Sequence, residues 1–287
     1  MKITDVLTGA PLYESKEDPI VRMEEFLASF PKEHRPGYHV SQLHSLCPVR
    51  EALRKRQEAE GVVEMIDPES WFNYRIGHAY HDIVQNELLG PVGALYGNWR
   101  CSHCEDRHPD FGPMPKGRPD CCTLKSTWEY VEPAVFDEEY DIVGNCDGLV
   151  GFSLDELDVL EIKSLNGMKF FKTTEAFAEH EFQAQVYAYL LKENKKYPIG
   201  NIRKIIIPYI GKGPHTNQGR IKRYHVNLSE VPYQKSVEKI KRIREIEACD
   251  GIPSESDRIC VHPKDDTAKY CPVAQECFFG NVLRRTP

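Results

Sequence analysis

The sequence has no long apolar run, and its start has no basic segment followed by an apolar core. A membrane span needs roughly 18 consecutive apolar residues, so the sequence excludes a transmembrane protein. The opening residues do not have the pattern of a secretory leader, and we therefore expect a cytoplasmic protein. The 287 residues are 40% hydrophobic and 10% aromatic, which is typical of a folded protein with one large domain or two small ones.

Acidic residues outnumber basic ones, and the net charge of −7 at first argues against a nucleic-acid partner. The charge is unevenly distributed, however. Residues 163–244 contain 17 Lys and Arg but 6 Asp and Glu, a net charge of +11, and the rest of the chain carries −18. Such a basic region indicates either a polyanion-binding surface or a lysine-rich helix face exposed to solvent.

The pattern of apolar residues predicts an α/β fold, in which helical periodicity and short β-type runs alternate. The predicted strands are 128–135, 140–150, 158–162, 203–210 and 220–226, and the predicted helices are 49–60, 68–89, 174–193 and 231–247. Residues 1–40 have one amphipathic stretch, 21–30, and no motif that we can interpret. We therefore expect an N-terminal extension followed by one domain over 41–287.

Three charged residues are predicted to meet at one point of the sheet. Asp147 lies in an apolar stretch, and Glu161 and Lys163 lie two residues apart in the next strand, where alternate side chains share a face. If the two strands form a hairpin, the three side chains converge. The two carboxylates and the main-chain carbonyl of Ile162 would suit Mg²⁺ or Mn²⁺, and Lys163 would orient a water or stabilise negative charge. An exposed salt bridge on a hairpin is the alternative.

A histidine on the predicted helix 68–89 is a candidate for the same site. Gly77 and His81 are one helical turn apart, which leaves a small residue beside an imidazole on the side that faces the core. His81 is either a nitrogen ligand of the metal or a buried structural histidine.

The helix 174–193 places Gln183 and Tyr187 on one face. These polar groups can orient Lys163 or hold a nucleotide phosphate. An ordinary amphipathic helix would have the same pattern.

The order of these motifs, Gly-x-x-x-His, Asp, Glu-x-Lys and Gln-x-x-x-Tyr, resembles the RecB-type branch of the PD-(D/E)XK nucleases. In particular it resembles the CRISPR-associated RecB-like exonucleases and their phage relatives, over about 41–279. The resemblance implies a restriction-endonuclease-like core, a central mixed sheet flanked by helices, within a RecB-like nuclease domain over 41–287. It further implies metal binding by His81, Asp147 and Glu161, catalysis by Asp147, Glu161 and Lys163, and support of the site by Gln183 and Tyr187.

The same resemblance implies a [4Fe–4S] cluster held by one cysteine before the nuclease core and three after it. The sequence has Cys47 before the core and Cys260, Cys271 and Cys277 in a Cys-rich tail, 250–287. Four thiolates are the usual complement of such a cluster, which would join the N-terminal and C-terminal segments. Ten residues separate Cys260 from Cys271, a longer gap than the tight pair of the family, so zinc in the same thiolates is the alternative.

A separate group of cysteines predicts a structural zinc in a ribbon-like insertion over 97–125. Two residues separate the first pair, and two adjacent cysteines follow after sixteen residues, a spacing typical of tetrahedral zinc sites. The favoured ligands are Cys101, Cys104, Cys121 and Cys122. Adjacent cysteines seldom both bind one ion, so His108 or His103 in place of one of them is the alternative.

Together with the resemblance, these residues predict a metal-dependent deoxyribonuclease, an exonuclease acting on single-stranded DNA or DNA ends. By resemblance it would serve phage or bacterial recombination or replication, in the host cytoplasm if phage-encoded, beside a single-strand-annealing or single-strand-binding protein. The alternatives are a DNA-processing endonuclease within a larger complex, a non-catalytic nucleic-acid-binding accessory protein, and an electron-transfer role for the cluster.

Overall fold

The computed structural model describes residues 19–30, 36–59, 65–122, 125–212, 220–248, 257–269 and 271–279. The chain divides into two units, 1–34 with 63–75 and 35–62 with 76–287. The first unit contains the helix α1 (Pro19–Ala28). Just after this helix, the Phe30 carbonyl accepts a 3.0 Å hydrogen bond from the Ile66 N–H, which connects the two segments of the unit. None of the described helices is long and apolar enough to cross a membrane.

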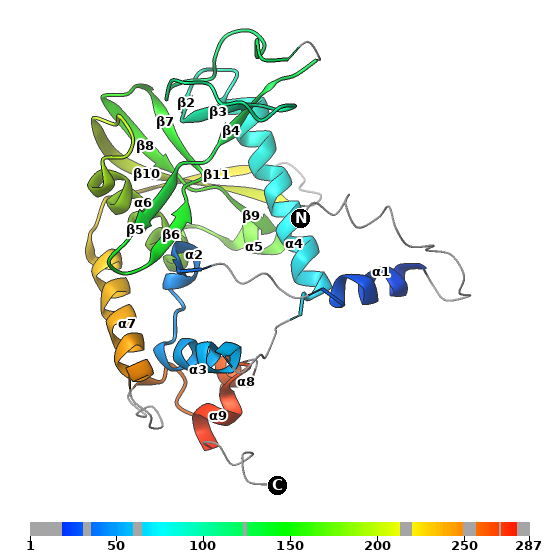
Figure 1. Ribbon diagram of the computed structural model, residues 1–287, viewed down its shortest axis with the longest axis vertical. Coiled ribbons are helices and arrows are strands. Elements are labelled where there is room, and N and C mark those ends of the chain that lie inside the picture. Colours follow the sequence, from blue (N-terminus) through cyan, green and yellow to red (C-terminus); the bar gives the residue numbers. More distant parts are fainter. Residues whose placement is uncertain are drawn as a thin grey trace. The chain divides into compact units, whose positions relative to one another are not determined.

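A six-stranded mixed sheet is the base of the second unit (Figure 1). The strands β11-β10-β8-β7-β2 follow one another across the sheet, and β9 also pairs with β10. Both β8 and β9 run parallel to β10, β8 along its first half and β9 along its second. The bounds are β2 (Leu95–Tyr96), β7 (Gly148–Ser153), β8 (Glu156–Leu160), β9 (Lys163–Asn166), β10 (Asn201–Lys212) and β11 (Ile221–Val226).

Two smaller sheets accompany the large one. In the first, β6 pairs in parallel with β1 and in antiparallel with β5, and in the second β3 pairs in antiparallel with β4. The bounds are β1 (Tyr38–His39), β3 (Asn98–Cys101), β4 (Trp128–Val131), β5 (Ala134–Asp137) and β6 (Ile142–Asn145).

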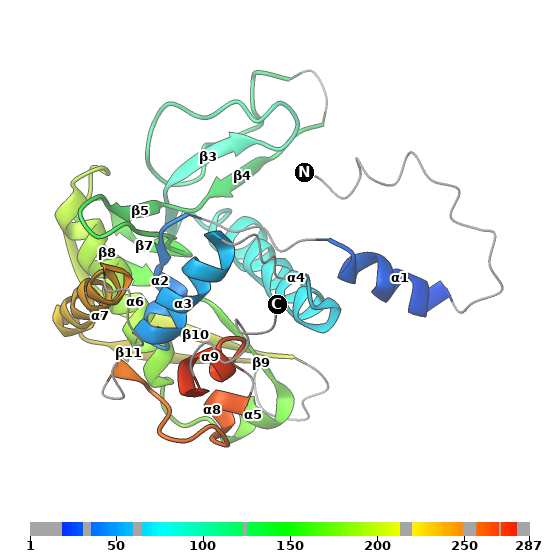
Figure 2. The ribbon, with the colours of Figure 1, turned by 60° about the horizontal axis from the view of Figure 1, so that its bottom comes forward.

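The helix α6 (Ala178–Asn194) forms the centre of the core, because it packs against both β10 and β5. The helix α7 (Val231–Ala248) packs on α6 and on α3 (Pro48–Ala59), and α9 (Ala274–Phe279) lies beside α3 (Figure 2). The segment after Cys47 and the C-terminal segment are thus neighbours in space. The remaining short helices of this unit are α2 (Val40–Leu43), α5 (Gly167–Lys172) and α8 (Asp266–Lys269).

Mixed sheets flanked by helices confirm the expected α/β class, and α3, α6, α7, β10 and β11 match the predicted elements closely. Two predicted strands are wrong as continuous elements, since 128–135 is β4 and β5 and 140–150 is β6 and β7. The predicted strand 158–162 corresponds to β8, which begins and ends two residues earlier. The first break is explained by Pro133, which has no N–H to continue a ladder.

The predicted helix 68–89 also differs from the structure. It is an α-helix, α4 (Pro68–Asp82), followed by a π-helix, η2 (Ile83–Leu89), and none of the residues of α4 is buried. The expected core-facing stripe is limited to the second half of α4, where Tyr80 packs partly buried against Leu160, Ile162 and Ile210. With 3.6 residues per turn, the exposed Tyr74 lies on the opposite side of the helix from the exposed Phe72 and Ile76.

Candidate metal centres

Three acidic residues lie where the predicted strands break. Glu132 follows β4, Asp147 lies between β6 and β7, and Glu161 lies between β8 and β9. At the first two breaks the chain passes from one sheet to another, since β4 pairs with β3 and β5 with β6, while β7 belongs to the large sheet. The three acidic residues therefore lie between strands, near the places where the chain passes from one sheet to another.

His81, Glu132 and Asp147 form a group in which the potential ligand atoms all lie within 4.8 Å of one another. His81 Nδ1 is 3.5 Å from Asp147 Oδ1 and 3.7 Å from Glu132 Oε1. Burial disfavours the charged imidazole, but the two carboxylates outweigh this effect and raise the pKa of His81. Two carboxylates and an imidazole are a donor set that suits a divalent cation.

Asp147 is held at its position by the strands around it. The antiparallel pairing of β7 with β8 sets Gly148 opposite Leu160, which confirms the expected hairpin. The main-chain N–H of Ile162 donates a 2.6 Å hydrogen bond to Asp147 Oδ2. Burial, together with the nearby charge of Glu161, raises the pKa of Asp147 well above its usual value. A cation beside these acids would stabilise their charged forms and so lower the pKa of Asp147 again.

Glu161 is fully buried, and its carboxylate faces Lys163. Lys163 Nζ lies 2.5 Å from Glu161 Oε1, although neither carboxylate oxygen has hydrogen-bond geometry to any described residue. Burial opposes the charge of Lys163, but Glu161 and Asp147 outweigh it and raise the pKa of the ammonium. The structure therefore brings His81 and Asp147 together with Glu132, while Glu161 contacts the lysine.

Sequence reasoning missed Glu132 and Gln85. Gln85 is the buried residue of η2, and its Nε2 donates to the main-chain oxygen of Asp147 at 2.6 Å and to Glu132 Oε1 at 3.0 Å. The π-helical bond from the Gly90 N–H to the Gln85 carbonyl, at 2.9 Å, is part of the irregular turn. An acid placed just before Pro133 was the available signal for Glu132.

Gln183 and Tyr187 are both buried on α6, with Gln183 Nε2 3.4 Å from the Tyr187 hydroxyl. Burial, with smaller effects of Glu161 and Asp147, raises the pKa of Tyr187 well above its usual value. These two side chains thus lie close enough to the acidic residues to be affected by their charge.

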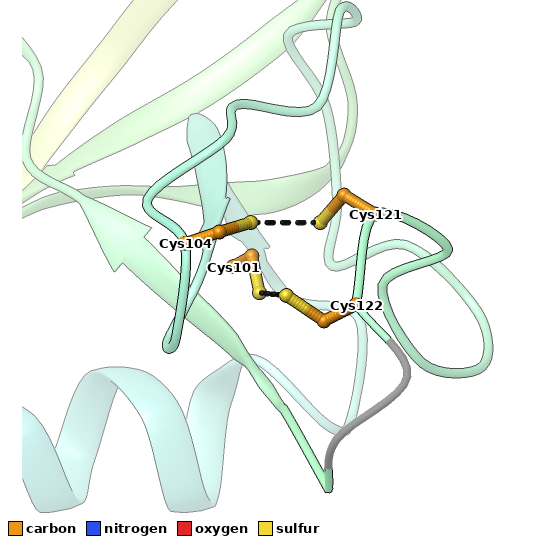
Figure 3. Close-up of side chains that lie close together, drawn as sticks. All are labelled: Cys101, Cys104, Cys121 and Cys122. Atoms are coloured by element: carbon orange, nitrogen blue, oxygen red, sulfur yellow. Dashed lines mark hydrogen bonds between the residues drawn. The ribbon is translucent and has the colours of Figure 1, made fainter.

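The cysteines of the insertion point toward one another (Figure 3). Cys104 Sγ is 3.2 Å from Cys121 Sγ, and Cys101 Sγ is 3.6 Å from Cys122 Sγ. The four sulfurs all lie within 4.8 Å of one another, as the ligand atoms of the acidic group do. Among the described residues, no histidine belongs to this set. His108 instead accepts a hydrogen bond from the Asp110 N–H at 3.3 Å. The group can hold a metal.

The other predicted cysteine group lies around the contact of α3 with α9, since Cys47 directly precedes α3 and Cys277 lies in α9. Burial raises the pKa of the Cys260 thiol, and charge on Cys47 and Cys271 raises it further. Burial likewise raises the pKa of Cys277, with additional effects of the other three cysteines. The four thiols therefore interact electrostatically, although they do not form a group as tight as that of the insertion. Cys249 lies outside the described residues.

Several basic residues of the region 163–244 form hydrogen bonds or ion pairs within the molecule. At the end of α2, two main-chain carbonyls accept hydrogen bonds from Lys239, at 2.9 and 2.8 Å. Arg242 pairs with Asp257 and Arg244 pairs with Asp141. Three of the basic residues of α7 therefore contact other parts of the molecule, and Lys235 of α7 stays exposed.

No protein-family model and no curated protein matches this chain. Among solved structures, the protein SSO0001 is 16% identical, with 90% of this chain and 93% of that chain covered and a TM-score of 0.42. The alkaline exonuclease LHK-Exo from Laribacter hongkongensis is 9% identical, with 74% and 87% covered and a TM-score of 0.43. Matches this distant carry no conclusion about this chain, and the function proposed below rests on the geometry of the site.

Proposed function

We propose that this protein is a metal-dependent deoxyribonuclease of the RecB-type PD-(D/E)XK class, acting as an exonuclease on single-stranded DNA or DNA ends. The observation that carries the proposal is the arrangement of a buried carboxylate and a lysine, Glu161 and Lys163, beside the group His81, Glu132 and Asp147. Acids beside a fixed ammonium are the groups that phosphodiester hydrolysis requires.

The chemistry of the donors supports a divalent cation, Mg²⁺ or Mn²⁺. Glu161 and Asp147 are two buried carboxylates, and Lys163 is a single ammonium beside them, so a second positive partner would offset the remaining buried charge. His81, Glu132, Asp147 and Glu161, with the main-chain carbonyl of Ile162, would hold the ion. When bound, such an ion supplies charge that polarises the phosphodiester and acidifies water.

The chain's own residues account for the positioning of the reactants. Lys163 Nζ, held by Glu161, would orient a water for attack on phosphorus and stabilise the negative charge that develops there. The new bond joins the water oxygen to phosphorus as the bond to the 3′ oxygen breaks. The attacking water gives up one proton and the departing 3′ oxygen takes one up, which leaves a 3′-hydroxyl and a 5′-phosphate. Gln183 and Tyr187 would support the lysine and the strand from α6.

Two further cofactors belong to the proposal. Cys101, Cys104, Cys121 and Cys122 would hold a structural Zn²⁺, since four thiolates at this separation suit tetrahedral zinc. Cys47, Cys260, Cys271 and Cys277 would hold a [4Fe–4S] cluster. Their mutual electrostatic effects and the contact of α3 with α9 support this assignment.

The nuclease is tested with Mg²⁺ or Mn²⁺ on linear single-stranded, linear duplex and circular single-stranded DNA. Wild-type protein should release nucleotides from linear DNA, and Lys163→Ala, Asp147→Asn and Glu161→Gln should each lose most activity. The exposed residues Lys192 and Glu193 provide matched controls, Lys192→Ala and Glu193→Gln. Cleavage of the circle would indicate an endonuclease. Binding without cleavage would indicate an accessory protein, and wild-type activity in Lys163→Ala would reject the proposed site.

The cluster is tested on protein purified without air. About four irons and four sulfides per chain, with a visible absorption band that bleaches on reduction, are expected. Cys47→Ser should lower the iron content and Cys146→Ser, a buried cysteine outside both groups, should not. Zinc alone at these cysteines would overturn the cluster assignment.

A further inference from the structure

A short helix beside the proposed catalytic lysine exposes side chains that a core helix would bury. The strand β9 begins at Lys163 and leads directly into α5, over about 10 Å of extended chain. Phe170 is the buried residue of α5, whereas Met168 is 72% exposed and Phe171 is 39% exposed. Lys169, between them, and Lys172, directly after Phe171, are exposed, so α5 presents apolar and cationic groups together.

The exposed face of α5 is held firmly. The side chain of Asn166 accepts a 2.8 Å hydrogen bond from the Lys169 N–H at the start of the helix. At its end, Lys222 Nζ donates to the carbonyls of Phe170 and Thr173, at 2.7 and 2.8 Å. An open, shallow hollow on this anchored helix is lined by Asn166, Met168, Lys169 and Lys172.

Aromatic residues connect the hollow to Lys163. Lys169 Nζ lies 4.3 Å from the centre of the Phe177 ring, and the Phe177 and His180 rings are 5.5 Å apart. Burial lowers the pKa of His180 to about 4, and the charges of Lys163 and Lys169 lower it further. The imidazole is therefore close enough to both lysines to be affected by their charge.

The cations of this surface are available to a ligand. Lys169 and Lys172 form no ion pair with any residue that the structure describes, in contrast to Arg242 and Arg244 of α7. The acid that acts on His180 is Glu179, in the first turn of α6.

We infer that α5 forms a binding surface for single-stranded DNA that leads into the proposed active site. The phosphates would contact Lys169 and Lys172, and unpaired bases would lie on the exposed side chains of Met168 and Phe171. Paired bases present no free face, so apolar and aromatic contacts of this kind select a single strand. The inference rests on the proposed nuclease function and specifies its substrate.

Fluorescence anisotropy with a labelled oligothymidylate, in chelator and therefore without cleavage, tests the surface. Lys169→Ala/Lys172→Ala should weaken binding about tenfold at low salt. It should also reduce the slope of log affinity against log salt by about 1.4, the value for two phosphate contacts to a single strand. Met168→Ala should weaken binding with an unchanged salt slope, because it removes an apolar contact only.

The matched control is Lys192→Ala/Lys235→Ala, which removes two exposed lysines from α6 and α7. The proposed surface would be overturned if the two double variants lost equal affinity for the oligonucleotide. It would also be overturned if Lys169→Ala/Lys172→Ala lost as much affinity for a duplex of the same length as for the single strand. Photo-crosslinking of the wild-type protein to an oligonucleotide containing 5-iododeoxyuridine needs no variant, and crosslinks solely outside 166–180 would also overturn it. A protein that binds the strand here but never cleaves DNA would reject the nuclease alone.

Discussion

The side-chain amide of Gln85 donates a 2.6 Å hydrogen bond to the main-chain carbonyl of Asp147. The same nitrogen lies 3.0 Å from Glu132 Oε1, so one buried amide links two of the three residues of the acidic group. The linkage requires the π-helical turn of η2, in which Gln85 is the buried residue. Irregular turns of this type are frequent at functional sites.

Replacement of Gln85 by methionine, which has a similar size but no donor, should weaken Mn²⁺ binding about 10- to 100-fold, the usual effect of residues that orient metal ligands. Isothermal titration calorimetry measures the affinity. The control is Gln185→Met, which removes a hydrogen bond from a side-chain amide away from the site. In the wild type, Gln185 Nε2 donates to the carbonyl of Asn227 at 3.1 Å. An unchanged Mn²⁺ affinity in Gln85→Met, with lower thermal stability, would indicate a purely structural role.

Replacement of Cys121 by serine should release one bound zinc per chain, because its sulfur lies within the four-cysteine group. Elemental analysis measures the loss, and limited proteolysis should show faster cleavage within 97–125, since a structural zinc contributes directly to folding. His108→Ala should retain the metal. Loss of zinc in His108→Ala, with retention in Cys121→Ser, would contradict the four-cysteine set.

Replacement of Gly144 by alanine should destabilise the fold by about 1–3 kcal/mol through overpacking. A methyl group at this position would lie 2.8 Å from Cε1 of the Tyr187 ring and 3.1 Å from Cγ2 of Val40. Both neighbours are buried and cannot move away freely. Urea unfolding measures the change. Gly112→Ala, where no atom lies within 4 Å of the added carbon, should have a much smaller effect.

The stability of the protein should fall in acid partly because of His180. Burial lowers its pKa from 6.5 to about 4 in the folded state. The unfolded chain takes up a proton first as the pH falls below 6.5, which favours unfolding, and the loss is complete near pH 4. The contribution is at most about 3 kcal/mol.

Ring signals in nuclear magnetic resonance spectra measure this titration directly. Neutral His180 Nδ1 lies 2.8 Å from the Tyr209 hydroxyl and can accept a hydrogen bond from it. The same hydroxyl accepts a hydrogen bond from the Phe177 N–H at 2.7 Å. His180→Phe should therefore lower stability at pH 7 and make it less dependent on pH between 4 and 6.5. A midpoint of His180 near 6.5 would contradict the prediction.

Local patterns predicted three of the long helices and the last two strands. Apolar spacing in 49–60, 174–193 and 231–247 predicted α3, α6 and α7, because the helical period is written in neighbouring residues. The hairpin that brings Asp147 toward Glu161 and Lys163 was also predictable, since alternate residues of a strand share a face. The close grouping of the four insertion cysteines agrees with their spacing.

Pro133 marks the first strand break in the sequence, whereas only the tertiary structure decided the other two. Glu132, Asp147 and Glu161 stand at these breaks because the chain changes sheets, or leaves a register, to satisfy partners far away in sequence. Glu161 illustrates this, as its N–H bonds to the carbonyl of Ile206, on β10. The role of Gln85 likewise depends on a π-helical turn and on two distant acceptors. Apolar periodicity records which residues avoid water, but it does not record which sheet they join.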